Sequence, residues 1–179
     1  ATEDFSELTE HLHFDVLIIG AGIAGLYTAL HIDEGHSCCI LTKEDTEISN
    51  SWLAQGGIAA AISPLDDPKY HFEDTMIAGA GLCDEAAVRV LVSEGPDDVR
   101  KLVDMNVPFD LDPEGDLDIT REGGHHRRRI VHAGGDATGR ETVKALAHLV
   151  SLRSNVTFMP HNFFVDILTD ENGEVTGCA

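Results

Sequence analysis

The sequence predicts an α/β fold built around one strand–turn–helix–strand unit. Three observations support this prediction: an apolar run at residues 14–19, a glycine-rich turn at residues 20–25 and a second apolar run at residues 37–41. Residues 26–32, between the turn and the second run, have a helical pattern. The unit occupies about 30 residues, the span expected of a βαβ unit, so we expect two parallel strands, the first of them buried.

Beyond this unit the sequence alternates helices, short strands and irregular stretches. The expected elements are helices at residues 71–78 and 138–152, short strands at residues 128–132 and 156–159, and irregular segments at residues 44–68 and 106–126. Residues 163–169 and the residues from Glu174 onward are expected to be paired strands, because the Asn172-Gly173 dipeptide between them favours a hairpin turn. We expect residues 1–12 to be a disordered or loosely attached lead-in, and residues 13–179 to form one incomplete domain.

Two successive helices are expected between residues 84 and 105. Asp84 is a suitable N-cap for a helix that ends near Ser93. Gly95 is expected to interrupt this helix, and Pro96 suits the first turn of another that runs to Met105.

The charge of the chain excludes one large class of partners. The formal net charge is −20, with 32 acidic residues against 12 basic ones, so nucleic acid is not an expected partner. The excess of acidic residues is consistent with simple solubility or with adaptation to high salt. The acidic residues are spread along the chain and not collected in a tail, which favours adaptation to high salt. Because no apolar run approaches the roughly 20 residues that span a bilayer, and the start lacks a secretion signal, we expect a soluble cytoplasmic protein with no membrane partner.

The four cysteines indicate neither a metal site nor a disulfide framework. They are Cys38, Cys39, Cys83 and Cys178, and no two of them form a CxxC pair. Buried, reduced thiols are the favoured interpretation, and no metal is expected.

The glycine-rich turn has the GxGxxG spacing of dinucleotide-binding proteins. That spacing is weak evidence alone, but here a strand precedes it and a helix follows, which is the context that the motif requires. Gly20 would allow a tight turn, Gly22 a close approach of the backbone to a pyrophosphate, and Gly25 the packing of helix on strand. The helix N-terminus would then face the phosphates. The residues expected at this site are Gly20, Ala21, Gly22, Ile23, Ala24 and Gly25.

The second strand of the unit departs from the usual dinucleotide pattern. An acidic residue is expected near its end, where it binds a ribose, but this sequence has Thr42-Lys43-Glu44 there. Lys43 is either a solvated surface lysine or a contact to the adenosine end of a cofactor.

Two further segments have unusual composition. The first contains Asn50, Ser51, Trp52, Leu53, Ala54, Gln55, Gly56 and Gly57. Its glycines permit unusual backbone conformations, and its small residues would allow close approach to a flat ring; a tight turn leading into a buried helix explains it equally well. The second, residues 120–141, holds five of the twelve basic residues. These would attract an anion or pair with internal carboxylates, while the histidines lack the HExxH spacing of a zinc site.

Together these segments resemble the L-aspartate oxidase family, within the flavoproteins of succinate dehydrogenase and fumarate reductase. The resemblance covers residues 15 to about 149 and includes the segments 16–22, 54–59, 74–84, 120–125 and 128–140. It implies a Rossmann-like FAD-binding domain of the glutathione-reductase type, here truncated. It also implies oxidation of L-aspartate to iminoaspartate, with oxygen or fumarate as electron acceptor, as the first step of NAD synthesis through quinolinate.

The resemblance also implies roles for individual residues. Asn50 occupies the position where respiratory members carry the histidine that links FAD, so the cofactor is expected to be bound non-covalently. Lys43 is expected at the adenosine end, residues 50–57 along the flavin, and Glu122 beside L-aspartate as the residue that orients it. His126 departs from the serine usual in the oxidases, which puts a hydroxyl contact there in doubt.

Other parts of the expected machinery are not found in this sequence. The resemblance places the rest of the FAD domain, the capping domain, the C-terminal helical domain and the proton-accepting arginine beyond Ala179. We therefore expect these 179 residues alone to be inactive on L-aspartate. Two alternatives remain: an oxidoreductase of the same group that acts on succinate or fumarate, and a module that only binds a nucleotide.

Overall fold

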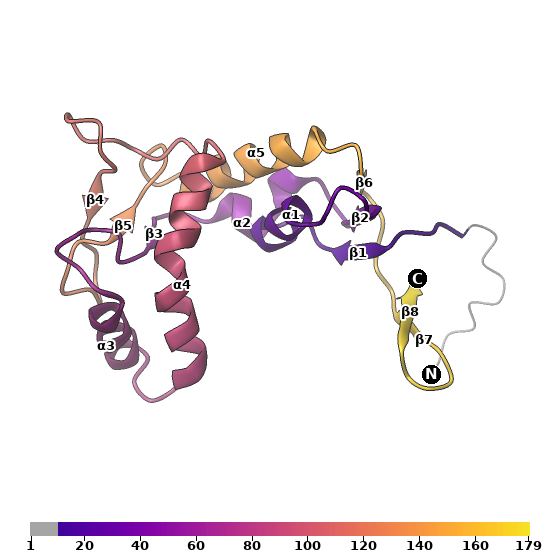
Figure 1. Ribbon diagram of the computed structural model, residues 1–179, viewed down its shortest axis with the longest axis horizontal. Coiled ribbons are helices and arrows are strands. Elements are labelled where there is room, and N and C mark those ends of the chain that lie inside the picture. Colours follow the sequence, from indigo (N-terminus) through magenta and orange to yellow (C-terminus); the bar gives the residue numbers. More distant parts are fainter. Residues whose placement is uncertain (1–10) are drawn as a thin grey trace. The chain divides into compact units, whose positions relative to one another are not determined.

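The computed structural model describes residues 11–179, which form two compact units (Figure 1). The first unit comprises the described residues up to Asn50 together with Leu146–Ala179, and the second comprises Ser51–Ala145. Most of the expected N-terminal lead-in, residues 1–10, lies outside the described residues; residues 11 and 12 are exposed and have no regular structure.

A parallel sheet forms the centre of the first unit. Strand β1 (Val16–Ile19) leads through the glycine turn into helix α1 (Ile23–Leu30) and then strand β2 (Cys38–Leu41). Strand β6 (Val156–Met159) pairs with the other side of β2, which gives the order β1-β2-β6 with all strands parallel. The expected strand–turn–helix–strand unit is therefore confirmed. Because β2 is central, residues 38–40 are almost completely buried.

The expectation that the first strand is buried was wrong: two of its four residues are exposed and the other two are half-buried. Leu17 is 37% exposed and Ile19 is 49% exposed. Within the described residues β1 pairs with β2 alone, so it is an edge strand, and alternate side chains of a strand point to opposite faces. The apolar run predicted the strand correctly but could not show which of its faces is covered.

Side chains tie the ends of α1 and β6 together. Arg153 donates hydrogen bonds to the carbonyl oxygens of Leu30 (3.4 Å) and Ile32 (2.6 Å), which satisfies acceptors at the end of α1. Asn155 donates to the carbonyl oxygens of Asp33 and His36. These contacts hold the turn that follows α1 against the strand that comes more than a hundred residues later.

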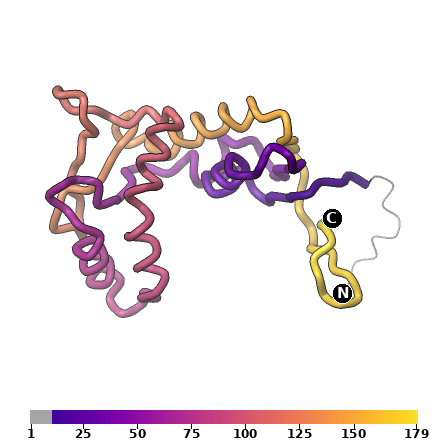
Figure 2. The backbone as a smooth tube through the Cα atoms, viewed as in Figure 1, coloured from indigo at the N-terminus to yellow at the C-terminus, as the bar shows by residue number. Residues whose placement is uncertain are grey.

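A hairpin ends the first unit and is visible at the yellow end of the chain in Figure 2. Strands β7 (Ile167–Thr169) and β8 (Val175–Cys178) are antiparallel, and Gly173 between them has φ +80. The predicted hairpin is confirmed. Residues 163–166 were expected to belong to its first strand but lie outside β7. Elsewhere in this unit, a 3-10 helix η1 (Thr46–Ile48) forms within a segment that was expected to be irregular.

The second unit combines helices with a small antiparallel sheet. Helix α2 (Asn50–Leu53) begins at the boundary, and strands β3 (Ile58–Ala59), β4 (Ile119–Thr120) and β5 (Ile130–Val131) pair in the order β3-β5-β4. Helices α3 (Pro68–Ala78) and α4 (Glu85–Asp104) pack against each other. The boundary between the two units falls within helix α5 (Thr138–Ser151). The expected helices at residues 71–78 and 138–152 are confirmed.

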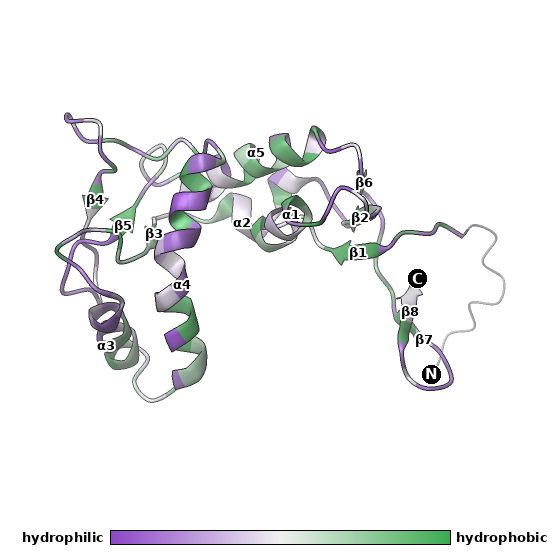
Figure 3. Ribbon diagram, viewed as in Figure 1, coloured by the Kyte–Doolittle hydropathy of each residue, from purple (hydrophilic) through white to green (hydrophobic). Residues whose placement is uncertain are grey.

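Helix α4 corrects the expectation of two helices separated at Gly95. It is continuous, with Pro96 in its interior, and Asp84 caps it by accepting a hydrogen bond from the amide of Ala87. The reason is packing. The buried residues of α4 continue across the proline at intervals of three and four: Val88, Val92, Pro96, Val99 and Leu102. One apolar face therefore spans the site of the expected break, and tertiary contacts outweigh the local preference. Figure 3 shows hydrophobic and hydrophilic residues alternating along α4.

Candidate active site

The glycine turn between β1 and α1 has the geometry that its sequence predicted. Gly20 has φ +106, and its amide donates to the carbonyl oxygen of Leu41, the last residue of β2, at 2.8 Å. A Cβ added to Gly25 would lie 2.0 Å from the carbonyl oxygen of Gly20. The structural roles predicted for these two glycines are therefore confirmed. At the start of α1, Gly22 is the N-cap and provides no side-chain cap.

Lys43 follows the end of β2 at the same edge of the sheet as the glycine turn. The hydrogen bond from Gly20 to Leu41 joins the two segments. Lys43 is exposed, and the neighbouring Thr42 donates its hydroxyl to the carbonyl oxygen of Glu44. In parallel sheets ligands bind at the carboxyl ends of the strands, and that is where Lys43 and Gly20 lie.

Gly56 and Gly57 end a segment of the second unit whose backbone packs closely against its neighbours. Gly56 has φ +81 and open space around it. A Cβ on Gly57 would lie 2.5 Å from both Ile130 Cγ2 and the Val131 carbonyl oxygen, so this residue abuts β5. A Cβ on Gly139, at the start of α5, would lie 2.1 Å from the carbonyl oxygen of Ser51. The segment thus abuts the start of α5 at Ser51 and β5 at Gly57, and no room remains for a Cβ at positions 57 and 139.

Glu122 opens into a cavity that also contains Gly56. The cavity has a volume of ≈ 350 Å³, and its lining residues are Gly56, Asp110, Asp118, Thr120, Glu122, His132, Gly135 and Asp136. Four of these residues are acidic. Oε1 of Glu122 lies 2.8 Å from Nε2 of His132. The partner of the Glu122 carboxylate in the structure is thus a histidine.

Asp110 also lines this cavity. Its carboxylate accepts hydrogen bonds from the amides of Gly134 (2.9 Å) and Gly135 (3.0 Å), which have φ +60 and +72. The amide of Asp110 donates to the carbonyl oxygen of His132 at 2.8 Å. Asp110 therefore fixes the turn that follows β5, and its carboxylate is already hydrogen-bonded.

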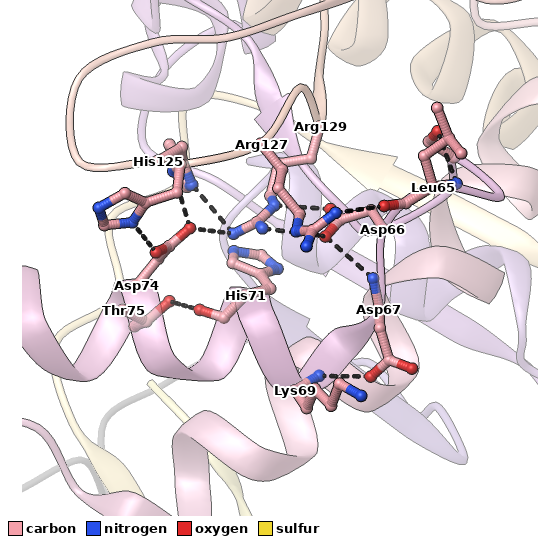
Figure 4. A network of polar contacts seen from close by, with 12 residues as sticks. Leu65, Asp66, Asp67, Lys69, His71, Asp74, Thr75, His125, Arg127 and Arg129 are labelled. Carbon is pink, nitrogen blue, oxygen red and sulfur yellow. Dashed lines mark hydrogen bonds and ion pairs between the residues drawn. The ribbon is translucent and has the colours of Figure 1, made fainter.

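A buried ionic network anchors the arginine-rich loop. The guanidinium of Arg129 is completely buried and binds Asp66 through two nitrogens, at 2.8 and 3.0 Å. Its third nitrogen lies 2.9 Å from Oδ2 of Asp74 in α3. Figure 4 draws Arg129, Asp66 and Asp74 together, with dashed lines for these contacts. The amide and the ring of His126 both contact Asp74. Pairing with internal carboxylates is therefore confirmed for Arg129.

The other arginines of this loop differ in their surroundings. Arg127 lies 3.9 Å from the centre of the Tyr70 ring and donates to the carbonyl oxygen of Leu65. Arg140 pairs with Glu141. Arg121 and Arg128 line a second cavity of ≈ 560 Å³ together with Thr120 and His126. Attraction of an anion there stays a prediction.

The network shifts the pKa of two buried groups. Burial lowers the pKa of His71, and the positive charge of Arg129 lowers it further; Nδ1 of this ring has no hydrogen-bond partner. Burial alone would raise the pKa of Asp74, but hydrogen bonds from His126 and the charge of Arg129 outweigh it and lower the pKa. His71 is thus kept neutral and Asp74 ionised.

The described residues contain no candidate metal site and no candidate membrane-spanning helix. No group of three or more histidines, cysteines and acids in residues 11–179 has the geometry to hold a metal. None of the helices formed by these residues combines the length and apolar character needed to cross a bilayer. All four cysteines are free thiols. Cys38 and Cys39 are buried as expected, whereas Cys83 and Cys178 are only half-buried, so the expectation of buried thiols was wrong for these two.

Sequence reasoning missed the partners that hold the candidate site together. His132, Asp110, Asp66 and Asp74 received no role, although His132 and Asp74 stand in segments that carried the resemblance. The position of His132 within a segment that carried the resemblance was a usable signal, but nothing local connects it with Glu122, ten residues earlier in the chain.

Comparisons with known proteins agree with this architecture. The chain matches the family described as FAD binding domain over residues 15–179. It is 48% identical to an L-aspartate oxidase of Streptomyces coelicolor over 164 residues, which is 91% of this chain and 28% of that protein. It is 43% identical to the chloroplastic L-aspartate oxidase of Arabidopsis thaliana over 166 residues, or 93% and 25% of the two chains.

Solved structures show the same fold. The quinol fumarate reductase of E. coli superposes with a TM-score of 0.85 and 29% identity, over 92% of this chain and 28% of that one. For Sdh1 of Mycobacterium smegmatis the TM-score is 0.84 and the identity 28%, over 92% and 30% of the two chains. The chain thus spans about a quarter of the length of the curated relatives named here. On these matches, the chain belongs to the FAD binding domain family, whose cofactor is FAD.

Proposed function

We propose that the protein to which this chain belongs oxidises L-aspartate to iminoaspartate with FAD as its cofactor. The observation that carries the proposal is that Glu122 and Gly56 line one cavity. Gly56 comes from the segment expected along the flavin, and Glu122 is the residue expected to orient the amino acid. The identity of 43–48% to L-aspartate oxidases supports the same substrate.

The residues present fit FAD at the glycine turn. The close approach of Gly25 to the carbonyl oxygen of Gly20, and the lack of a side-chain cap on α1, leave a helix N-terminus suited to a pyrophosphate. We propose a Rossmann-like domain of the glutathione-reductase type, with Gly20 to Gly25 at the pyrophosphate and Lys43 at the adenosine end. The parallel order β1-β2-β6 supports this topology.

The flavin end of the cofactor is proposed to lie along residues 50–57. Gly56 and Gly57 lack side chains where the backbone bends and meets β5, which leaves a surface of small groups for a flat ring. Asn50 cannot form the histidine linkage of respiratory members, so the proposal includes non-covalent FAD.

The proposed chemistry divides between cofactor and chain. FAD supplies a two-electron acceptor for a hydride from the α-carbon of L-aspartate, and oxygen or fumarate finally takes the electrons. The residues of this chain bind and orient. The carboxylate of Glu122 would pair with the α-ammonium group, a charge-assisted contact. The carboxylates of Asp118 and Asp136, which line the same cavity, add to its attraction for a cation.

The experiment that tests this proposal is the Glu122→Gln variant of the full-length protein, with Glu94→Gln on the exposed surface of α4 as the control. L-aspartate has an α-ammonium group and fumarate has none. Loss of the carboxylate should therefore lower L-aspartate oxidation about tenfold or more while fumarate reduction changes little. Equal losses in both reactions would favour a purely structural role for Glu122, and an unchanged aspartate rate would exclude it from the site.

A second candidate is an oxidoreductase of the same group that acts on succinate or fumarate. The superposition on fumarate reductase supports it, but the identity to that protein is 29% against 48% for an L-aspartate oxidase, and four carboxylates around one cavity suit a cationic substrate group better than a simple dicarboxylate. An assay of the wild-type protein with L-aspartate and with succinate separates the two.

We also propose a cytoplasmic location and a place at the start of NAD synthesis. The buried free thiols of Cys38 and Cys39 are consistent with a reducing compartment. The role in NAD synthesis depends on the L-aspartate oxidase activity proposed above.

A further inference from the structure

The ring of His132 supports the carboxylate of Glu122 from the inner side of the cavity. Nε2 of His132 lies 2.8 Å from Oε1 of Glu122. The side chain of His132 is 16% exposed, whereas that of Glu122 is 49% exposed. The histidine is therefore largely sheltered, and the carboxylate that it contacts opens to the cavity.

Two neighbours fix this ring in place. The hydroxyl oxygen of Thr120 in β4 lies 3.5 Å from Nδ1 of His132. On the other side, a Cβ on Gly57 would come within 2.9 Å of Nε2, so the ring occupies space that exists because residue 57 is a glycine. The backbone of His132 is held as well, through the hydrogen bond that its carbonyl oxygen accepts from Asp110.

The contact with Glu122 places one proton of the ring. A carboxylate is acceptor-only, so Nε2 carries a hydrogen and donates it to Glu122. The Thr120 hydroxyl lies 3.5 Å from Nδ1 and also 3.5 Å from the carbonyl oxygen of Ile130, to which it can donate. One oxygen of Glu122 is occupied in this way, and the other, Oε2, remains for a ligand.

We propose that His132 is a positioning residue that orients Glu122 to receive the α-ammonium group of an amino dicarboxylate substrate. This inference rests on the function proposed above. It adds the residue that holds Glu122 in the orientation needed to recognise the ammonium group of the substrate. A half-exposed glutamate loses rotamer freedom when it binds a ligand, and the hydrogen bond from His132 restricts the side chain beforehand. The other carboxylates that face the cavity are those of Asp110, Asp118 and Asp136; that of Asp110 is already bonded to two amides.

The test uses the full-length protein with bound FAD and compares three variants. His132→Leu removes the donor, His132→Gln keeps an amide donor of similar reach, and His148→Leu removes an exposed histidine of α5 as the control. KM and kcat are measured for L-aspartate oxidation and for fumarate reduction. His132→Leu should raise KM for L-aspartate about fivefold, because Glu122 regains the rotamer freedom that the hydrogen bond removed, with KM for fumarate within about twofold of wild type. His132→Gln should recover most of the loss.

The outcomes separate this inference from the proposed function. Equal rises in KM for both substrates, no rise in His132→Leu, or no recovery in His132→Gln would each overturn the role of His132 while aspartate oxidation by the wild type stands. A wild-type protein that does not oxidise L-aspartate would overturn the proposed function itself and the inference with it.

A second measurement does not depend on activity or on the folding of the His132 variants. In full-length protein labelled with ¹⁵N-histidine, His132 should carry a hydrogen on Nε2. Its ring signal should move in Glu122→Gln and stay unchanged in Glu94→Gln. A signal from the Nδ1–H form, or one insensitive to Glu122→Gln, would overturn the inference.

Discussion

Nη1 of Arg129 lies 2.9 Å from Oδ2 of Asp74, and neither side chain is more than 5% exposed. Asp66 binds the same guanidinium through two further hydrogen bonds. One cation is thus shared by two carboxylates inside the second unit. Because Arg129 directly precedes β5 and Asp74 lies in α3, the pair joins the loop that carries Glu122 to a helix far away in the sequence.

Removal of Asp74 from this network should destabilise the protein. In Asp74→Ala the Arg129 guanidinium retains its hydrogen bonds to Asp66 but loses the one to residue 74, and His126 loses its hydrogen bonds to the same carboxylate. The free energy of unfolding should therefore fall by about 1–3 kcal/mol. Asp97→Ala is the control, because Asp97 pairs with Arg100 on the exposed surface of α4, where such pairs contribute little. Urea unfolding of both variants measures the difference; equal midpoints would contradict a structural role for the network.

Acid should destabilise the protein in two steps. The folded state holds the pKa of His71 below the ordinary value of 6.5, so the unfolded state binds more protons as the pH falls below about 6.5 and stability declines. The pKa of Asp74 is lowered from 3.8, so its contribution is present above that pH and is lost as the pH falls through its folded value. The free energy of unfolding, measured between pH 8 and pH 3, should show both steps, and His71→Gln should lack the first. Equal stability at pH 8 and pH 5 would count against this account.

Substitution of Gly25 should abolish FAD binding. The added Cβ of Gly25→Ala would meet the carbonyl oxygen of Gly20 at 2.0 Å, which forces β1 and α1 apart at the proposed pyrophosphate site. Gly95→Ala is the matched control, because position 95 lies within α4 with nothing near its added Cβ, and alanine in a helix is favoured over glycine by about 1 kcal/mol. FAD content after purification should fall in the first variant alone. Full flavin occupancy in Gly25→Ala would show that this turn does not hold the cofactor.

FAD should separate from the full-length protein on acid denaturation. The reason is Asn50, whose amide cannot form the linkage that a histidine makes at that position. After precipitation in acid and centrifugation, the yellow colour should stay in the supernatant. Flavin that sediments with the polypeptide would refute non-covalent binding.

Molar salt should stabilise the protein. The net charge of −20 produces repulsion that is screened when the Debye length falls to about 3 Å at 1 M. The melting temperature of the full-length protein should therefore rise between dilute buffer and molar potassium chloride. A flat or falling melting temperature would favour the simpler interpretation of the acidic surface as a solubility device.

The sequence by itself determined the parts of the protein whose physics is local. The strand, the glycine turn and the helix around Gly20 follow from a short apolar run and residues that tolerate positive φ, and the hairpin turn at Gly173 follows in the same way. The close approach at Gly25 was also readable, because its partner is five residues away in the chain.

The tertiary structure alone decided what depends on residues far apart in the chain. The packing of α4 carried the helix through Pro96, against the local signal. The single sheet partner of β1 left Leu17 and Ile19 exposed. Arg129 met Asp66 and Asp74 across more than fifty residues, and Glu122 met His132 across a strand pair. Periodicity and composition report a residue's near neighbours, whereas the partner of a charged side chain depends on which strands and helices come together, and that is settled by the burial of the whole core.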